Sequence, residues 1–249
     1  MEKKLLFIGE AAKLIGVSID TLRKWEKKGI LQSFRPSLTS KRYYRQEDID
    51  QFLSKDSRSY VEDLVDLAKT WAFAKSPAPL SSSLYCQTSD VFNSRLQSLE
   101  LELARMPKLK DIFPLVIAVI GEIGSNSYNH NIGNWPDVPG IFFGYDIQQQ
   151  QVVLADRGQG IYKTLKRVAP NLKNDKEALY TAFTKYISSR APEERGNGLK
   201  FVKDVIISNP LYLQFYTGNA SLELRQNISN LKIKTADTSF HGCIAVINF

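Results

Sequence analysis

Apolar and polar positions divide the chain into a short N-terminal part and a longer part with a different pattern. In residues 7–53, apolar residues recur at helical spacing, and glycine or serine residues separate the helical stretches. Ser18 stands where a side chain can cap the second of these stretches. The pattern predicts helices at 7–15, 19–28 and 46–53, with a loop or small hairpin at 33–44.

The longer part begins with a helix, continues through a linker, and then combines helices with strands. The stretch 76–90 is rich in Pro and Ser and is the predicted linker. After Pro139, short apolar runs replace the helical pattern and predict strands. The elements expected in this part are helices at 60–75, 91–106, 112–132 and 198–208, a mixed helical region at 161–190, and strands at 140–147, 151–158, 211–218, 221–228 and 242–249.

Charge and cysteine usage narrow the class of protein. The chain has a net charge of +7, and residues 1–58 supply +5 of it, with 13 Lys and Arg against 8 Asp and Glu. Such a basic segment suits a nucleic-acid partner. The two cysteines and two histidines lack metal-ligand spacing, which argues against a disulfide scaffold and a structural zinc site. With no apolar run of about 18 residues and no signal peptide, we expect a cytoplasmic protein without a membrane partner.

The basic residues gather on the second short helix and on the hairpin that follows it. The run IGEAAKLIGVSIDTLRKWEKKGIL…SKRYYRQEDIDQFL, over residues 6–54, resembles the winged helix-turn-helix DNA-binding domain of MerR-type regulators and the related excisionase-type domains. The resemblance implies double-stranded DNA as a partner. For Trp25 on the second helix, we expect a place in the core rather than stacking on a base. The residues expected to contact DNA are Ser18, Thr21, Arg23, Lys24, Lys27, Arg35, Lys41, Arg42 and Tyr43. MerR regulators normally add a long dimerising helix and an effector domain. The helix at 60–75 is short for that role, but we still expect the protein to form a homodimer.

Three short motifs in the C-terminal part carry candidate chemistry. Glu122, Asn126 and His130 are spaced four residues apart, so they share one face of the predicted helix. The run Asp156-Arg-Gly-Gln-Gly-Ile follows a predicted strand, and its glycines allow a ligand to approach the backbone closely. The run Gly196-Asn-Gly-Leu precedes a helix, whose free N–H groups favour a phosphate. Neither glycine motif is a P-loop or a dinucleotide fingerprint, and each alone is also typical of a plain turn.

In this order, the three motifs resemble the GHKL ATPase superfamily, which includes gyrase, Hsp90, histidine kinases and MutL. The resemblance covers about residues 90–249 and is nearest to anti-sigma-factor serine kinases, which also keep the Glu four residues before the Asn. It implies the Bergerat fold, an α/β sandwich in which helices back a mixed sheet and ATP lies under a mobile lid. The fold class expected for the whole chain is therefore multi-domain, with a small helical domain followed by this sandwich.

The resemblance also implies roles for single residues. Asn126 would hold Mg²⁺, Asp156 would accept from the adenine amino group, and Glu122 would be the catalytic base. The lid would lie between Ile161 and Arg195, with Lys185 and Ser188 among its phosphate contacts. The full set of expected ATP-binding residues is Asn126, His130, Asp156, Gly158, Gly160, Ile161, Ser189, Arg190, Gly196, Asn197, Gly198 and Leu199.

The sequence supports three hypotheses of function. The first is a DNA-binding transcriptional regulator whose DNA affinity or oligomeric state responds to ATP or ADP. The second is an ATPase or serine/threonine kinase that is delivered to DNA or to a partner protein, and the third is a degenerate pocket that serves only for interaction. Residues 55–110 contain no histidine, so histidine autokinase activity is not expected. The expected domains are 1–55 for DNA binding, 56–90 as a helix and linker, and 91–249 for ATP binding.

Overall fold

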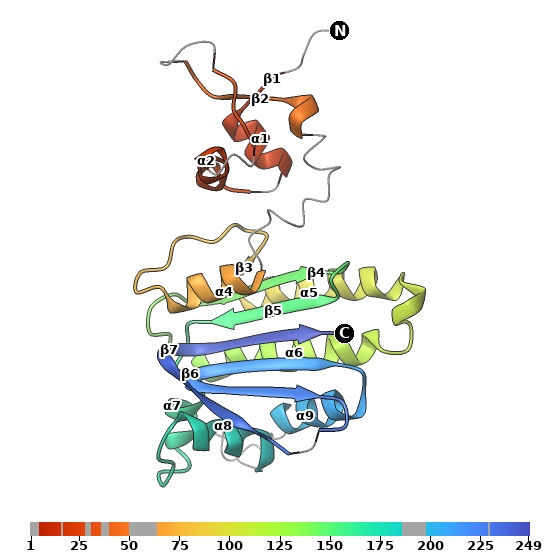
Figure 1. Cartoon of the computed structure of the whole chain (residues 1–249). Helices are drawn as coiled ribbons and strands as arrows, with labels where there is room; N and C mark the ends of the chain where they lie inside the picture. The colour runs from red at the N-terminus through yellow and green to blue at the C-terminus, as the bar shows by residue number, and fades with distance from the viewer. Residues whose placement is uncertain are drawn as a thin grey trace. The chain divides into compact units, whose positions relative to one another are not determined.

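The structure is a computed structural model of the whole chain. It describes residues 5–15, 17–27, 31–35, 40–49, 64–185, 198–228 and 230–249. The chain forms two compact units, Met1–Asp63 and Leu64–Phe249 (Figure 1).

The N-terminal unit is a small helix-turn-helix with a two-stranded sheet. Its elements are β1 (Leu5–Phe7), α1 (Ile8–Ile15), α2 (Ile19–Lys27) and β2 (Tyr43–Arg45). β1 pairs with β2 in an antiparallel fashion, and residues 46–49 are helical. Ser18 caps α2 as predicted, because its Oγ accepts from the Thr21 N–H at 3.0 Å. The core of the unit consists of Ala11, Ala12, Leu22, Trp25, Leu31, Tyr44 and Ile49, so the prediction that Trp25 is a core residue is confirmed.

The C-terminal unit is built on a five-stranded sheet with the order β3-β4-β5-β7-β6. The strands are β3 (Tyr85–Cys86), β4 (Ile141–Asp146), β5 (Gln151–Asp156), β6 (Tyr212–Arg225) and β7 (Ile233–Asn248). The sequence predicts a mixed sheet, but every neighbouring pair of described strands is antiparallel. The helical crossover from β5 to β6 does make these two strands parallel. β7 lies between them and runs antiparallel to both, so no parallel ladder forms.

Helices cover both faces of this sheet (Figure 1). They are α4 (Leu64–Phe73), α5 (Ser89–Ala104), α6 (Phe113–Asn131), α7 (Gly160–Lys166), α8 (Asp175–Thr184) and α9 (Gly198–Ser208), with a 3-10 turn at Pro107–Leu109. Side chains alternate along the strands. Phe143 and Leu154 face the larger core, which they share with α5, α6, α8 and α9, while Phe142 and Val153 face α4. The small domain followed by a helix-backed sheet is the fold class expected from the sequence.

The helix α4 belongs to this sheet, although it lies in the segment 56–90 that the sequence assigns to a helix and linker. Ala68 and Trp71 of α4 are buried against Phe142 and Val246. β3 also comes from that segment and pairs with β4. The compact unit therefore begins at α4, some 27 residues before the predicted boundary at 91.

The strands predicted separately at 211–218 and 221–228 form one long strand, β6. Gly218 and its neighbours shift the register against β7 at the place where the sequence predicts an interruption. Gly218 has a φ of 55°, and a Cβ there would overlap the carboxylate of Asp175. The glycine therefore marks a bulge against α8.

Candidate functional site

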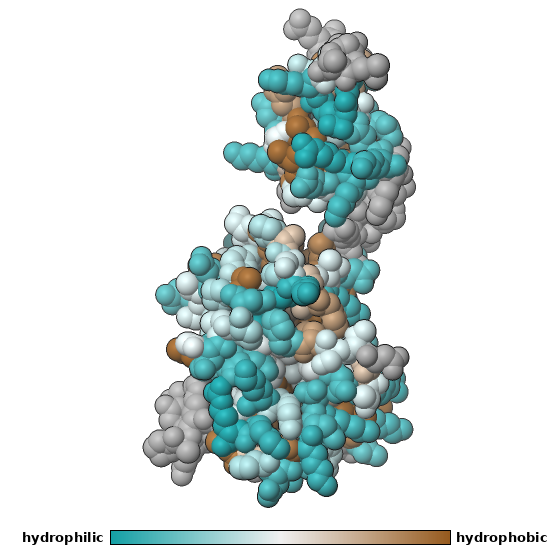
Figure 2. All heavy atoms as spheres, turned by 90° about the vertical axis from the view of Figure 1, so that its left-hand side faces the viewer, coloured by the Kyte–Doolittle hydropathy of each residue, from teal (hydrophilic) through white to brown (hydrophobic). Residues whose placement is uncertain are grey.

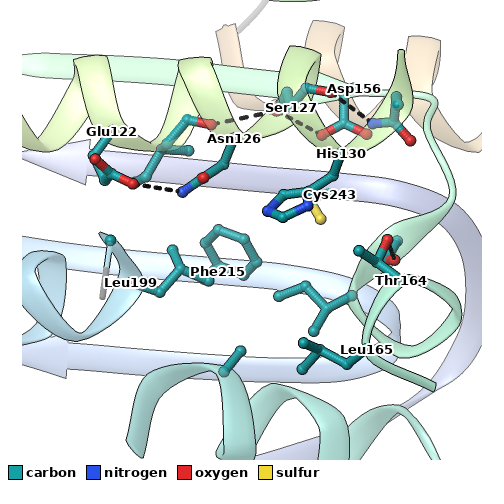
Figure 3. A pocket seen from close by; sticks show the side chains of 16 residues that line it. Glu122, Asn126, Ser127, His130, Asp156, Thr164, Leu165, Leu199, Phe215 and Cys243 are labelled. Carbon is teal, nitrogen blue, oxygen red and sulfur yellow. Dashed lines mark hydrogen bonds between the residues drawn. The ribbon is translucent and has the colours of Figure 1, made fainter. Parts of the chain in front are cut away.

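One cavity collects the motif residues on the face of the sheet that carries α6. Figure 3 shows Glu122 and Asn126 toward one end of it, near Leu199, and Asp156 toward the other end. The residues that line it are Glu122, Ile123, Asn126, Ser127, His130, Asn131, Asp156, Gly160, Ile161, Thr164, Leu165, Ala182, Gly198, Leu199, Phe215 and Cys243. The structure thus brings together motif residues from α6, β5, α7 and α9. The predicted residues Ser188, Ser189, Arg190, Gly196 and Asn197 lie outside the described residues.

Asp156, the last residue of β5, provides a buried carboxylate at the wall of the cavity. Its side chain is held at both oxygens: the Ser127 hydroxyl donates to Oδ2 and the Gly158 N–H donates to Oδ1, each at 2.8 Å. Burial raises the pKa of Asp156 to about 6, against the lowering effect of these hydrogen bonds and of one from the Cys243 backbone. Asp156 therefore presents a fixed hydrogen-bond acceptor above that pH.

Glu122 and Asn126 are neighbours on α6, one helical turn apart. The Asn126 Nδ2 donates to the Glu122 Oε1 at 3.0 Å, which leaves the Asn126 Oδ1 as an acceptor or metal ligand. A Cβ at Gly198 would overlap the Glu122 carboxylate, so α9 begins directly against this side chain. Glycine at this position allows the N-terminus of α9, the end of a helix that favours an anion, to approach α6 closely.

A bound metal ion would depend on few protein ligands. Among the described residues, no group of three or more His, Cys, Asp and Glu is placed to hold one. The side chains at this end of the cavity offer an amide oxygen, Asn126 Oδ1, beside one carboxylate, Glu122. Hard oxygen donors of this kind fit Mg²⁺, which usually takes one or two protein oxygens and completes its shell with phosphate and water.

Two further residues of α6, Ser127 and Asn131, line the cavity and were not predicted from the sequence motifs. Ser127 donates to Asp156, and Asn131 contacts the loop that follows Asp156. A Cβ at Gly158 would overlap the Asn131 side chain. Gly158 is not among the residues that line the cavity, and its small size allows the close contact with Asn131. Polar residues on the buried side of an apolar helix were the available signal, since Ser127 and Asn131 are also four residues apart.

Two helices occupy the first part of the segment 161–195 in which the lid is expected. α7 and α8 are regular helices that pack on each other through Leu165, Leu172 and Ala178. Phe183 of α8 is fully buried in the larger core of the sheet. The start of α7 also contacts β6, because the Ile161 N–H donates to the Thr217 hydroxyl at 3.1 Å. These packed helices form a wall of the cavity, and residues 186–195 of the expected lid segment lie outside the described residues.

The residue after Asp156 ties the cavity to α4. Arg157 is 1% exposed and donates from Nη1 to the carbonyls of Trp71 and Ala72, at 2.6 and 2.8 Å. It also pairs with Asp137, at 2.5 Å. Burial opposes ionisation of Asp137, but the hydrogen bonds from Arg157 outweigh it and lower the pKa of that carboxyl. Arg157 thus satisfies the C-terminal carbonyls of α4, which explains why this helix belongs to the C-terminal unit.

The expected DNA-binding residues of α2 lie largely at the surface. Lys24 and Lys27 are exposed, and Arg23 is exposed and pairs with Asp20 at 2.8 Å. The Thr21 hydroxyl lies 2.9 Å from the Ser18 hydroxyl, so both are also engaged in capping the helix. Figure 2 shows hydrophilic residues over most of the visible face of this unit, beside a small apolar group.

The hairpin residues divide into exposed and engaged ones. Lys41 is exposed and lies over the Phe7 ring, which in turn packs on Tyr43 with ring centroids 4.9 Å apart. Arg42 is different, because its Nε pairs with Glu26 of α2 at 2.7 Å. Burial opposes ionisation of Glu26, but hydrogen bonds from Ser33 and Arg42 lower its pKa. Arg35 is half-buried, and its charge also lowers that pKa.

Comparisons with known proteins gave a family match and a structural similarity. Residues 7–44 match the model of the MerR family regulatory protein. A similar solved structure is the ATPase region of Saccharomyces cerevisiae topoisomerase II, at 17% identity and a TM-score of 0.35. That match covers 52% of this chain and 36% of the topoisomerase chain. A search of the curated proteins found no match. No described helix is long and apolar enough to span a membrane.

Proposed function

We propose that this protein is a cytoplasmic DNA-binding transcriptional regulator that responds to ATP. In this proposal, ATP with Mg²⁺ binds in the cavity of the C-terminal unit and alters DNA binding or dimerisation. The observation that carries the proposal is the pairing, in one cavity, of a buried carboxylate at Asp156 with the Glu122–Asn126 pair at the start of α9.

The chemistry of the cavity supports a nucleotide that lies along it. At one end, Asp156 would accept a hydrogen bond from the adenine amino group. Apolar side chains that line the cavity, such as Leu165 and Phe215, offer a surface for a base. At the other end, the N-terminus of α9 favours phosphate, and Asn126 would hold Mg²⁺ together with phosphate oxygens. The likeness of the three motifs to GHKL ATPases supports the same orientation.

The N-terminal unit supports DNA as the partner. Its match to the MerR family model covers both helices and the beginning of β2. Lys24 and Lys27 on α2 and Lys41 on the hairpin are exposed, so their charges are available to phosphates. These contacts would supply affinity, while the exposed polar side chains of α2 would read base edges.

Arg157 offers a route by which nucleotide binding would reach the N-terminal unit. It follows Asp156 directly, and it binds the end of α4, the first described helix after the N-terminal unit in the chain. A ligand shifts an equilibrium only if it binds two states with different affinity. We propose that base binding at Asp156 favours one position of the loop at Arg157 and thereby one arrangement of α4.

DNA binding with and without nucleotide tests the proposal. The full chain would be incubated with a random-sequence double-stranded DNA library, with ATP–Mg²⁺, with ADP–Mg²⁺ or with neither, and the retained DNA would be quantified and sequenced. We expect ATP to change the retained amount or the selected sequences in the parent protein. The same addition should have no effect in an Asp156→Asn variant. Identical retention and sequences in all three conditions would refute ATP responsiveness.

One observation favours a second function, an ATPase or serine/threonine kinase. Glu122 lies at the phosphate end of the cavity, hydrogen-bonded to Asn126, where a general base for phosphoryl transfer would act. A protein that only senses ATP does not need this carboxylate. Phosphate release and transfer to protein substrates, measured on the samples used for DNA binding, distinguish the two functions. Nucleotide-dependent DNA binding without turnover selects the regulator.

A further inference from the structure

Asn131 ends α6 at the same cavity, and its side-chain amide is bound on both sides. The residue is 4% exposed. Its Nδ2 donates to the Ser127 carbonyl at 2.7 Å, and its Oδ1 accepts from the Gln159 N–H at 2.8 Å. A buried amide with both groups paired in this way fixes the segments that it joins. Asn131 therefore joins the last turn of α6 to the loop that follows Asp156.

The contact with Gly158 makes this junction close as well as hydrogen-bonded. A Cβ at Gly158 would overlap three atoms of the Asn131 amide, so the backbone at Gly158 lies directly against this amide. The loop is held at two successive N–H groups. That of Gly158 donates to the Asp156 Oδ1, and that of Gln159 donates to Asn131. The direction of the Asp156 carboxylate thus depends on where Asn131 holds the loop.

Ser127 completes the connection on the helix side. Ser127 lies one turn before Asn131. Its backbone carbonyl accepts a hydrogen bond from the Asn131 Nδ2, and its hydroxyl donates to the Asp156 Oδ2. Both oxygens of the Asp156 carboxylate are therefore contacted by residues that Asn131 touches, and the Cys243 backbone also donates to this carboxylate. Asn131 borders the cavity, and its amide forms hydrogen bonds with the Ser127 carbonyl and the Gln159 N–H.

We infer that Asn131 is a positioning residue for base selection: it fixes the Asp156 carboxylate so that the cavity takes a purine with an amino group in preference to one with a carbonyl at the same place. The inference rests on the proposed function, in which Asp156 reads the base. A fixed acceptor distinguishes the two purines because a carbonyl oxygen facing it is repelled. When the carboxylate is free to turn, the discrimination weakens while the phosphate contacts stay.

Affinities for ATP and inosine triphosphate test this role, because the two nucleotides differ in that group. Calorimetry at pH 7.5 with Mg²⁺ would compare the parent with Asn131→Leu. The matched control is Asn134→Leu, whose exposed side chain donates to the Ile132 carbonyl. We expect the parent and the control to bind ATP at least about tenfold tighter than inosine triphosphate. This ratio of affinities corresponds to the free energy of one hydrogen bond to a charged group.

In Asn131→Leu, that ratio should fall to within about twofold of one, with inosine triphosphate affinity nearly unchanged, because only the base contact is lost. Equal weakening of both nucleotides, with the ratio kept, would show a purely structural role and overturn the inference. If Asn131→Leu does not fold, Asn131→Ala, which leaves room for water at the amide site, should show the same loss of ratio.

Amide hydrogen exchange in the nucleotide-free protein gives a second readout. Exchange at Gln159 should be faster in Asn131→Leu than in the parent and unchanged in Asn134→Leu. Equal exchange in all three proteins would overturn the inference. If the parent binds neither nucleotide, the proposed function fails and base selection by Asn131 fails with it. A parent that prefers ATP beside a variant that keeps the preference refutes only the role of Asn131.

Discussion

Replacing Asp156 by Asn should make the nucleotide-free protein more stable near neutral pH while it weakens ATP binding. Asp156 is 3% exposed, and burial raises its pKa from 3.8 to about 6. The folded protein therefore resists ionisation of this group more than the unfolded chain does. An uncharged amide of the same shape removes that cost. Its oxygen can still accept from the Gly158 N–H, and its amino group can donate to the Ser127 hydroxyl.

The shift in pKa sets the size of the effect. At about 1.4 kcal/mol for each pKa unit, a rise from 3.8 to about 6 corresponds to about 3 kcal/mol. Below pH 3.8 the group is protonated in both states, so its contribution to stability is fully present. As pH rises, Asp156 releases its proton in the unfolded chain before it does so in the folded protein. The stabilising contribution of the protonated group therefore falls from about pH 4 and is lost once the pH has passed about 6. The variant has no such group, so its advantage should open between about pH 4 and pH 6 and then level off.

Urea unfolding followed by circular dichroism, at a series of pH values from 4.5 to 8, would measure this difference. We expect the free energy of unfolding of Asp156→Asn to exceed that of the parent by up to about 3 kcal/mol at pH 7.5, and by much less at the acid end. Ser127→Ala is a useful control, since it removes a hydrogen bond to Asp156 and leaves the charge. A variant that is no more stable than the parent at pH 7.5, or an advantage that does not depend on pH, would refute the reasoning.

Three further predictions concern other parts of the molecule. Glu122→Gln should keep ATP affinity but, if the protein turns ATP over, reduce phosphate release by at least about 100-fold; equal rates would exclude Glu122 as the base. Trp71→Ala should cost about 3–5 kcal/mol in urea unfolding, because its ring is buried against the sheet; a loss below about 1 kcal/mol would mean that α4 is not part of this core. Lys24→Ala should weaken binding to DNA of any sequence and reduce the salt slope by about one; an unchanged slope would place Lys24 away from phosphate.

The motif residues were predictable because each motif is local. Glu122 and Asn126 are separated by one turn of a continuous helix, so their sequence spacing already determines that they are neighbours. Asp156 ends a strand with a clear apolar pattern, and Gly198 begins a helix. Their order along the chain, together with the likeness to a known superfamily, was enough to expect one cavity. The structure brings these four residues to its walls.

The missed contacts all join residues that are far apart in the sequence. Ser127 reaches Asp156 across 29 positions, and Arg157 reaches Trp71 across 86. No local pattern predicts which polar side chain will satisfy a helix end or a strand end elsewhere. The composition of residues 76–90 also suggested a linker, although the helix before that stretch is buried on the sheet. Sequence alone also does not show that the Asn131 side chain fills the space beside Gly158.

Arg42 illustrates a related difficulty in the N-terminal unit. A basic residue in a hairpin of this kind is expected to face DNA, but Arg42 pairs with Glu26 of the neighbouring helix. Its replacement would disturb the fold of the unit as well as any DNA contact. Lys24 and Lys41 are cleaner probes of phosphate binding, because both are exposed.

The central claim is that the cavity between Asp156 and the Glu122–Asn126 pair binds ATP. Calorimetric titration of the full chain with ATP and Mg²⁺ tests it most directly. We predict saturable binding at one site per chain in the parent, with similar affinity in Glu122→Gln and at least about tenfold weaker binding in Asp156→Asn, since one hydrogen bond to a charged group is lost. No binding by the parent, or equal affinity in Asp156→Asn, would contradict the account.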